Sequence, residues 1–442
     1  MMRSSNNKDR VTLMGLLLIV AFFVLVALGI PIGYVLGIVA VGGVYFFWEP
    51  SYMLVLARKM VSGCDSFTIM AMPLFMLSGA LMNKSGITDA LVDFSKTLVG
   101  HIRGGLAHVT IVASTLFAGL TGVAMADVAA IGSIMIPAME KDGYTRAYAA
   151  AVVTTAAVIG PIIPPSLVML IYAHIMGQSV AALFLGGIVP GLLMAVGLMA
   201  YTYYIAKKRN YPKYRERPTV MELGKSFVAS LPALMAPMVI LGGIVFGFAT
   251  PTEAAALVVL YAFILGFFIT RKIKLADLAP MMLQSMVVTA VVFLIIGTAS
   301  QVGFLITDVH LPQSLAKYFI SVTDNKYLML MLINAFLLLM GMILEIIPNV
   351  VLLSPILAPL ALKLGVDPTH FAMVLLVNLN IGMNTPPMGG LMFITSAMAG
   401  EKFEAVLKES WAYIGTQMVT LVIITYIPDT VLWIPRIFGF VK

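Results

Sequence analysis

Long apolar runs joined by short polar connections form the dominant pattern along the chain. The runs lie at 11–30, 32–48, 66–83, 181–206, 227–248, 253–270 and 276–306. Their lengths cluster around the roughly 20 residues that an α-helix needs to cross a bilayer. The pattern therefore predicts an all-α polytopic membrane protein. The first run is followed too closely by the second to be a cleaved signal peptide, so we expect it to be the first spanning helix.

Composition agrees with this interpretation. Of the 442 residues, 61% are hydrophobic and 11% are charged, whereas soluble domains carry roughly 25% charged residues. The net charge of +7 comes from basic residues in the connections between runs, which argues against a nucleic-acid partner. The single cysteine, Cys64, excludes an internal disulfide.

Two basic connections orient the middle of the chain. The positive-inside rule places both 207–217 and 271–274 in the cytoplasm. Two runs joined by a tight turn at 249–252 separate them, which is self-consistent. The side of the N-terminus stays open, because Arg3, Lys8 and Arg10 favour the inside while the count of spans favours the outside.

An internal repeat becomes visible when the chain is compared with itself. The segment IGPIIPP at 159–165 matches IGMNTPP at 381–387, an offset of 222 residues. Over 119–165 and 341–387, 12 of 47 positions are identical, and half of these are glycine or proline. Because these residues constrain the backbone, the match predicts a common backbone course.

Each copy has the same order of parts. Two apolar stretches of about 12 residues come first, at 106–118 and 128–139 in one copy and at 328–340 and 350–362 in the other. They are too short to span, so we expect a helical hairpin that enters the membrane and returns. A long apolar segment follows, at 147–176 or 369–399, interrupted by the Gly and Pro-Pro cluster. The orientation predicts inverted repeats, with the first hairpin entering from the cytoplasm and 86–101 lying along the membrane surface.

The interruptions have a physical consequence. Proline inside a helix removes a backbone donor, and the freed carbonyls are tolerated at membrane depth only against protein or in a cavity. Paired broken helices in two halves of a chain point to a transporter's midplane site, where carbonyls bind Na⁺ and helix N-termini face an anionic substrate.

Three acidic residues stand out at the expected depth of the membrane: Asp127, Glu253 and Glu345. Asp127 and Glu345 fall at the two hairpin tips, and Asn349 occupies the position equivalent to Asp127. Two interpretations stay open for the tips: a cation site of carboxylate, hydroxyl and carbonyl oxygens, or carboxylates that stabilise a helix N-terminus. For Glu253, which follows Thr250, Pro251 and Thr252, we favour the helix cap.

Other polar residues near the two breaks are candidate ligands. Asn384 and Thr385 are the best side-chain pair for an ion or a substrate hydroxyl. Thr155 and Ser166 are further candidates, although such hydroxyls often bond to their own helix. Gly389 completes the expected substrate contacts. His108 and His174 have no metal-ligand spacing, and we expect them to be packed or interfacial.

The residues also resemble a known family. The stretches GGLAHVTIVASTLFAGLTGVAMAD (104–127), GYTRAYAAAVVTTAAVIGPIIPPSLVMLIYA (143–173) and FATPTEAAA (248–256) look like signature stretches of the large membrane subunit of TRAP (tripartite ATP-independent periplasmic) transporters. The resemblance covers nearly the whole chain. It implies Na⁺-coupled import of an organic acid through an inverted-repeat, elevator-type fold with two re-entrant hairpins and two broken helices, located in a bacterial inner membrane.

The resemblance also implies partners and ion ligands. A small four-helix membrane subunit and a periplasmic binding protein would complete the system, with two or more Na⁺ ions per transport cycle. The implied ion ligands are Thr121, Gly122, Asp127, Gly160, Pro161, Glu345, Asn349, Gly382, Asn384 and Thr385. The family often has serine where Thr121 stands and aspartate where Glu345 stands, so the second site is the less certain in geometry.

The expected division of the chain follows from the repeats. Residues 104–176 and 328–399 form the transport domain, and the scaffold comprises 1–100 with a first arm, 177–327 with a second arm, and a C-terminal helix in 400–442. Rival functions are a stand-alone divalent-anion carboxylate transporter, a channel, and a membrane-embedded enzyme in which Asp127 and Glu345 act as a catalytic pair. The acid stays open among sialic acid, C4-dicarboxylates, keto acids and sugar acids.

Overall fold

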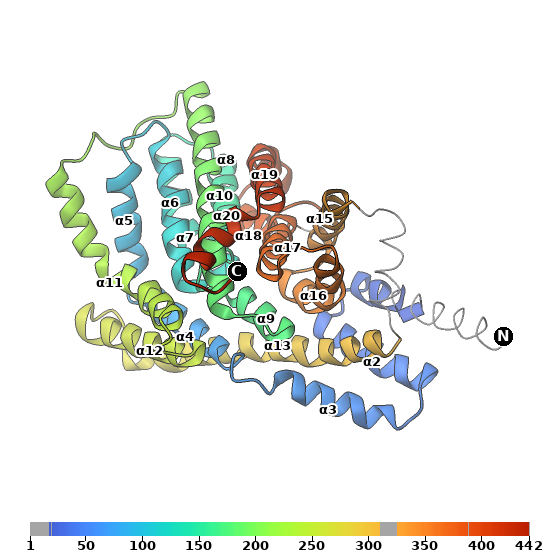
Figure 1. The fold of residues 1–442 in the computed structure, drawn as a ribbon. Coiled ribbons are helices and arrows are strands. Elements are labelled where there is room, and N and C mark those ends of the chain that lie inside the picture. Colours follow the sequence, from blue (N-terminus) through green and yellow to red (C-terminus); the bar gives the residue numbers. More distant parts are fainter. Residues whose placement is uncertain (1–16, 19, 310–324, 388, 442) are drawn as a thin grey trace.

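The structure is a computed structural model that describes residues 17–18, 20–309, 325–387 and 389–441. Every regular element in these ranges is helical, as predicted (Figure 1). The first half contains α2 Ile32–Phe47, α3 Tyr52–Cys64, α4 Ala71–Lys84, α5 Ile87–Val99, α6 Gly105–Thr121, α7 Ala124–Lys141, α8 Arg146–Ala157, α9 Leu167–Met176 and α10 Val180–Lys208. The second half contains α11 Val220–Val245, α12 Pro251–Ile264, η1 Leu265–Ile269, α13 Leu275–Asp308, α15 Lys326–Ile343, α16 Ile346–Lys363, α17 Pro368–Met383, α18 Gly390–Ala399, α19 Phe403–Tyr426 and α20 Asp429–Ile437.

Several of these helices could cross a membrane. Within the described ranges, six are long and apolar enough by length and composition: α10, α11, α12 with η1, α13, α15 and α16. A seventh span results if α19 and α20, bent by 60° at their junction, are counted together. Part of the predicted first spanning helix and residues 310–324 of the predicted second arm lie outside the described residues. The chain is thus a multi-pass membrane protein.

The repeat found in the sequence is a structural repeat. Helix α7 begins at 124 and ends at 141, and α16 begins at 346 and ends at 363, so both ends are displaced by 222 residues. The expected arm length of about 12 residues is wrong, because α6 has 17 residues and α7, α15 and α16 have 18 each. The helical hydrogen bonding of each arm continues into its polar ends. A prediction based on apolar residues alone does not include these ends.

Each pair of arms turns over two residues. Gly122 and Val123 connect α6 to α7, and Leu344 and Glu345 connect α15 to α16. Gly122 has φ +60°, and a Cβ there would overlap the carbonyl oxygen of Pro165, so the turn requires glycine. In both repeats a broken helix follows, α8 with α9 and α17 with α18.

The two repeats enter from opposite faces. The start of α8 lies beside the 207–217 connection, since the Arg209 guanidinium lies 5.5 Å from the ring centroid of Tyr148. Near its start, α19 contacts the same connection through Glu409, 2.9 Å from Arg209. Near its end, α19 reaches the start of α15, where the rings of Tyr426 and Tyr327 lie 5.9 Å apart. The second hairpin therefore opens on the face opposite the first, as the inverted-repeat prediction requires.

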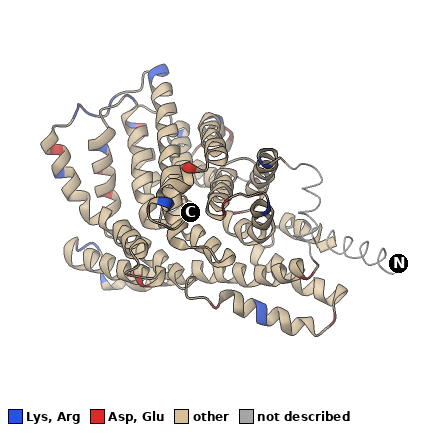
Figure 2. Ribbon diagram, in the orientation of Figure 1, with Lys and Arg blue, Asp and Glu red and all other residues tan. Residues whose placement is uncertain are grey.

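The helix packing is reciprocal between the repeats. Helix α18 packs on α7 and α8, and α9 packs on α16 and α17. The long helices follow the same rule, since α10 contacts α17 and α19 contacts α8. A second group, in which α13 packs on α2, α3 and α4, and α4 on α12, lies along one edge of the molecule (Figure 1). Lysine and arginine colour mainly helix ends and connections (Figure 2).

Helix α5 links these groups along the predicted cytoplasmic side. Asp89, near its start, pairs with Lys272 at 3.2 Å. Beyond its end, the Gly100 carbonyl accepts a hydrogen bond from the Tyr214 amide at 3.0 Å. Both ends thus contact connections that the positive-inside rule places in the cytoplasm. This agrees with the prediction that 86–101 lies along the surface.

Candidate functional site

The tip of the first hairpin carries a buried carboxylate. Asp127 lies in the first turn of α7 and is 0% exposed. The Thr121 hydroxyl, at the end of α6, donates a hydrogen bond to Asp127 Oδ1 at 2.5 Å. The other oxygen, Oδ2, is buried without a hydrogen-bond partner among the described residues. Asp127 therefore presents one acceptor atom that the surrounding protein leaves unsatisfied.

The first break lies against this oxygen. Helix α8 ends at Ala157, and α9 begins at Leu167. A Cβ on Gly160 would overlap Asp127 Oδ2, so only glycine lets the carboxylate approach the backbone here. The Gly160 carbonyl accepts no hydrogen bond from any described residue. Thr121, Gly122, Asp127 and Gly160 are thus brought together, as the sequence predicts.

Pro161 and Ser166 have a different arrangement from the one expected. The Ser166 hydroxyl donates to the Pro161 carbonyl at 2.6 Å and accepts from the Met169 amide at 3.4 Å as the N-cap of α9. The Pro161 carbonyl is therefore not free, although its second lone pair stays available. The Ser166 hydroxyl therefore connects the unwound segment at Pro161 to the first turn of α9. The peptide bond between Pro164 and Pro165 is cis, as is the one between Pro386 and Pro387.

Thr155 contributes its backbone to the site region. Its hydroxyl donates to the Ala151 carbonyl at 2.7 Å, within its own helix. Its carbonyl accepts from Gln417 Nε2 of α19 at 2.8 Å, while the Ile159 amide bonds to Ala156 instead. Gln417 is 0% exposed, and its Oε1 has no partner among the described residues. Because the Thr155 hydroxyl already donates its proton, it could contact a substrate only as an acceptor.

The second hairpin tip separates two residues that the sequence groups together. Asn349 is 0% exposed, and its Nδ2 donates to the carbonyls of Met340 and Leu344 at 3.1 and 3.0 Å. Its Oδ1 is buried without a described partner. Glu345, the N-cap of α16, has an exposed side chain and makes no side-chain cap bond. In the structure, Asn349 is therefore buried at the hairpin tip, whereas the Glu345 side chain lies on the surface of the tip.

The second break begins later than the first. Gly382 lies in the last turn of α17, and its carbonyl accepts from the Thr385 amide at 2.8 Å, which leaves one lone pair for another partner. A Cβ on Gly382 would lie 2.7 Å from the Gly341 Cα of the hairpin, which makes the contact one of backbone on backbone. Because α17 continues four residues beyond the position equivalent to Ala157, the unwound segment is shorter.

Asn384 and Thr385 differ in what they leave available. Asn384 is 0% exposed, and both Nδ2 and Oδ1 lack partners among the described residues. Thr385 donates its hydroxyl to the Ile381 carbonyl at 2.8 Å. Gly389 is the N-cap of α18 with φ +49°, and a Cβ there would lie 3.2 Å from the Phe403 ring. Of these three residues, Asn384 is the one whose side chain is free for a ligand.

Further buried polar atoms occur in the repeats and in α19. Beyond the predicted residues, the atoms without a described partner include Asn378 Oδ1, Asn380 Oδ1, Ser396 Oγ and Gln417 Oε1. A buried polar group left unsatisfied costs about 1–3 kcal/mol. Sequence reasoning did not single out Ser396 or Gln417, although a glutamine inside the apolar α19 was a usable signal.

Residues away from the tips have structural roles. Glu253 accepts from the Thr250 amide at 2.8 Å, and the Glu253 amide donates to the Thr250 hydroxyl at 3.3 Å, which confirms the predicted cap. His174 lies 3.2 Å from the Gly63 carbonyl, between α9 and α3.

The donor set at the tips is chemically suited to a hard monovalent cation. At the first tip, a carboxylate oxygen, a hydroxyl oxygen and a carbonyl oxygen lie in one region, and hard cations prefer oxygen ligands. In the second repeat, the buried oxygens without a described partner include the amide oxygens of Asn349, at the tip, and of Asn384, at the end of α17. The buried carboxylate belongs to the first tip, whereas the Glu345 carboxylate of the second tip is exposed.

The chain matches known proteins over nearly its full length. Residues 19–430 match the family described as "Tripartite ATP-independent periplasmic transporter, DctM component". The sialic acid TRAP transporter large permease protein SiaM of Vibrio cholerae is 36% identical over 413 residues, which cover 93% of this chain and 96% of that protein. The C4-dicarboxylate TRAP transporter large permease protein DctM of Pseudomonas aeruginosa is 37% identical over 392 residues, covering 89% and 92%.

A solved structure supports the fold independently. The YdaH transporter of Alcanivorax borkumensis, described as having an unusual topology, aligns with a TM-score of 0.59 over 89% of this chain and 91% of that one. At 15% identity this similarity concerns the fold alone. The match over 19–430 and the named permeases confirm the predicted family: the chain belongs to the large permease subunits, the DctM component, of the tripartite ATP-independent periplasmic transporters, and it is a transport protein and not an enzyme.

Proposed function

We propose that this permease imports an organic acid by symport with Na⁺ across a bacterial inner membrane. The observation that carries the coupling is Asp127 Oδ2, a fully buried carboxylate oxygen without a described partner, packed against the backbone of Gly160. A buried unpaired carboxylate is costly, and a charge at membrane depth is a functional candidate by default. A bound Na⁺ would offset that cost.

Two ion sites follow from the two tips. The first would use Thr121, Asp127 and the Gly160 carbonyl. The second would use the amide oxygens of Asn349 and Asn384, without the Glu345 carboxylate, because that side chain is exposed. The first site then binds Na⁺ with a compensating charge, and the second with neutral dipoles only. We expect the first site to bind Na⁺ more tightly for this reason.

The transport step would be an elevator movement of the repeats 104–176 and 328–399 against a scaffold. The buried contacts refine the division expected from sequence. Gln417 of α19 bonds to the Thr155 carbonyl, and Gly187 of α10 leaves no room for a Cβ against the Ile162 carbonyl. We therefore assign α10 and α19 to the moving part, and α2, α3, α4, α11, α12 and α13 to the scaffold.

The substrate class is an organic acid. Two relatives of similar identity have names that specify sialic acid and C4-dicarboxylates, so overall similarity does not select one acid. Asn384 is the side chain best placed to contact the acid or its ion. The tripartite family implies two partners, a small membrane subunit and a periplasmic binding protein, with the surrounding bilayer as the environment.

Reconstitution tests the coupling. Proteoliposomes would contain this chain and its small subunit, with the binding protein and a radiolabelled acid outside. We expect uptake only under an inward Na⁺ gradient. Uptake that runs equally well on a proton gradient alone would refute Na⁺ coupling. Uptake that needs no binding protein would instead favour the stand-alone carboxylate transporter.

A further inference from the structure

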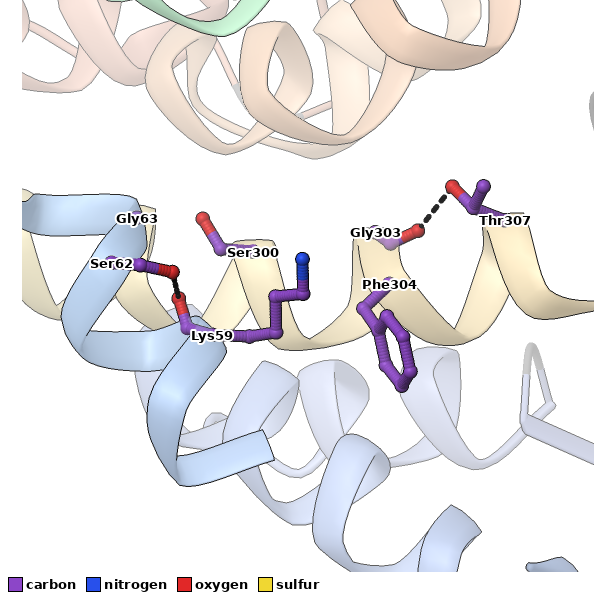
Figure 3. Close-up of a pocket in the computed structure, with 7 residues that line it drawn as sticks. All are labelled: Lys59, Ser62, Gly63, Ser300, Gly303, Phe304 and Thr307. Carbon is purple, nitrogen blue, oxygen red and sulfur yellow. Dashed lines mark hydrogen bonds between the residues drawn. The ribbon is translucent and has the colours of Figure 1, made fainter. Parts of the chain in front are cut away.

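A hollow of about 360 Å³ lies outside the hairpin tips, between α3 and α13. We call it the α3/α13 hollow, lined by Lys59, Ser62 and Gly63 of α3 and by Ser300, Phe304 and Thr307 of α13. In Figure 3, the Lys59 ammonium points to the same side of α13 as the side chains of Ser300 and Thr307. The hollow thus has one cationic group at its edge.

Lys59 has no acidic partner within the part of the chain that the structure describes. Its ammonium lies 5.5 Å from the centroid of the Phe304 ring, which fixes it over α13. The hydroxyls of Ser300 and Thr307 donate to the carbonyls of Ile296 and Gly303, at 2.8 and 2.7 Å. Lys59 is therefore the lining side chain with N–H groups to spare, and an anion here would be attracted mainly by charge.

Contacts place the hollow at the boundary between scaffold and moving part. The Gly63 carbonyl lies 3.2 Å from His174 Nε2, near the end of α9. A few residues along the chain, the Phe67 carbonyl accepts from the Thr252 hydroxyl at the start of α12, at 2.7 Å. The ends of α9 and α12 concerned are those that the positive-inside rule places on the external face. The hollow therefore lies at the level where a solute enters.

We infer that the α3/α13 hollow is an entry-side subsite that binds a carboxylate group of the solute through Lys59 before the solute reaches the breaks. The inference rests on the proposed function for the identity of the ligand. The interaction itself is between a small carboxylate and the single exposed ammonium group of Lys59. Such an interaction is weak and is screened by salt. Its role is to raise the local concentration of anions at the boundary, as charged clefts do.

Thiol labelling tests the subsite without requiring transport. In the full chain with Cys64→Ser, the variant Thr307→Cys places a thiol in the hollow. The labelling rates of an anionic and a cationic methanethiosulfonate are compared. We expect Lys59→Met to lower the anionic-to-cationic rate ratio by about threefold or more at low salt. The matched control is Arg58→Met, which removes the same charge one residue away and outside the lining, and should change the ratio by less.

Protection by ligand identifies what occupies the hollow. Succinate should slow the labelling of Thr307→Cys relative to chloride at equal ionic strength, and this protection should disappear with Lys59→Met. The same labelling is measured in nanodiscs with and without phosphatidylglycerol, an anionic lipid. Protection by the anionic lipid but not by succinate would overturn the inference in favour of a lipid site. Equal ratios in Lys59→Met and Arg58→Met would also overturn it.

Transport then links the subsite to function. In proteoliposomes, Lys59→Met should raise the half-saturating concentration of the acid about fivefold and leave the half-saturating Na⁺ concentration unchanged, while Lys59→Arg restores the wild-type value. An unchanged half-saturating concentration of acid would refute the entry role. Absence of Na⁺-driven uptake by the wild-type protein would refute the proposed function instead, and the labelling arms would still report on the hollow.

Discussion

The two acidic residues at the hairpin tips have opposite surroundings. Asp127 is fully buried, with one oxygen bonded to Thr121, whereas the Glu345 side chain is exposed. Their positions in the repeat explain this difference. Glu345 is equivalent to Val123, at the hairpin turn, while the equivalent of Asp127 is Asn349, one helical turn further on. A shift of four residues moves a side chain from the turn to the packed first turn of the helix.

Asp127→Asn should weaken Na⁺ binding, because it removes the charge that faces the cation. We expect the Na⁺ concentration for half-maximal uptake to rise at least tenfold, which corresponds to about 1.4 kcal/mol. The control Glu345→Gln also removes one carboxylate charge, but from an exposed side chain. It should change the Na⁺ concentration for half-maximal uptake less than twofold. Equal effects of the two variants would contradict the assignment of the first site to Asp127.

Gly160→Ala tests how closely the break approaches that carboxylate. The added methyl group would overlap Asp127 Oδ2, so it should displace the carboxylate and abolish the rise in melting temperature that Na⁺ produces by binding the folded state. Gly415→Ala, in α19, where no atom of the described residues lies within 4 Å of the Cβ position, should leave the Na⁺ effect intact, because alanine is favoured in helices. A wild-type Na⁺ response in Gly160→Ala would contradict the geometry.

At the scale of elements, the breaks owe their stability to neighbouring helices. The Thr155 carbonyl, left without its usual amide partner where α8 ends, accepts from Gln417 of α19. The Pro161 carbonyl accepts from Ser166, which caps α9. Unwound backbone at membrane depth is tolerated only when such groups satisfy it. The first break is therefore stabilised by α19 and by its own Ser166, and not by its prolines alone.

Gln417→Leu removes the donor to the Thr155 carbonyl and leaves that carbonyl buried without a partner. We expect the free energy of unfolding in mixed micelles to fall by about 1–3 kcal/mol. Thr416→Ala serves as the control, because the Thr416 hydroxyl is exposed and bonds only within α19; its effect should stay below about 0.5 kcal/mol. If both variants are equally stable, the Gln417 bond has no role in holding the break.

Across the whole molecule, the helices form two groups, which α5 and direct contacts such as α13 on α16 and α4 on α6 connect. The inverted repeats pack reciprocally with α10 and α19, and the other long helices pack around α13. Contacts between the groups include the one between α6 and α11, where a Cβ on Gly119 would lie 3.1 Å from Pro237 Cβ. Such a division permits one group to move relative to the other, which is what the proposed elevator mechanism requires.

Cross-linking across that contact tests the movement. In a Cys64→Ser background, oxidation of the Gly119→Cys/Pro237→Cys pair should join hairpin and scaffold, since disulfide Cβ atoms lie about 3.8 Å apart. We expect uptake to fall at least tenfold and to recover with reductant. The pair Gly33→Cys/Leu294→Cys, between α2 and α13 where a Cβ on Gly33 would lie 3.1 Å from Leu294 Cγ, lies within the scaffold and should leave uptake unchanged. Full uptake by the oxidised first pair would contradict the elevator movement.

The fold class, the repeat and the family could all be predicted from the amino-acid sequence. These features follow from local properties. Runs of apolar residues predict the membrane helices, and basic connections predict their orientation. Glycine and proline at a fixed offset predict equivalent backbone courses in the two repeats. The sequence also predicted that four residues at the tip and the break of the first repeat lie together: Thr121, Gly122, Asp127 and Gly160.

Which polar atoms lack a hydrogen-bond partner became clear from the helix packing and not from the sequence. The sequence could not show that Ser166 satisfies the Pro161 carbonyl, that α17 continues through Gly382, or that Glu345 is exposed. It also could not show that Gln417 reaches Thr155 or that Lys59 borders a hollow on α13. Whether a donor or acceptor is satisfied depends on local backbone geometry, as for Ser166 and Pro161, or on partners hundreds of residues away, as for Gln417 and Thr155, and the packing of α19 on α8 brings the distant partners into contact.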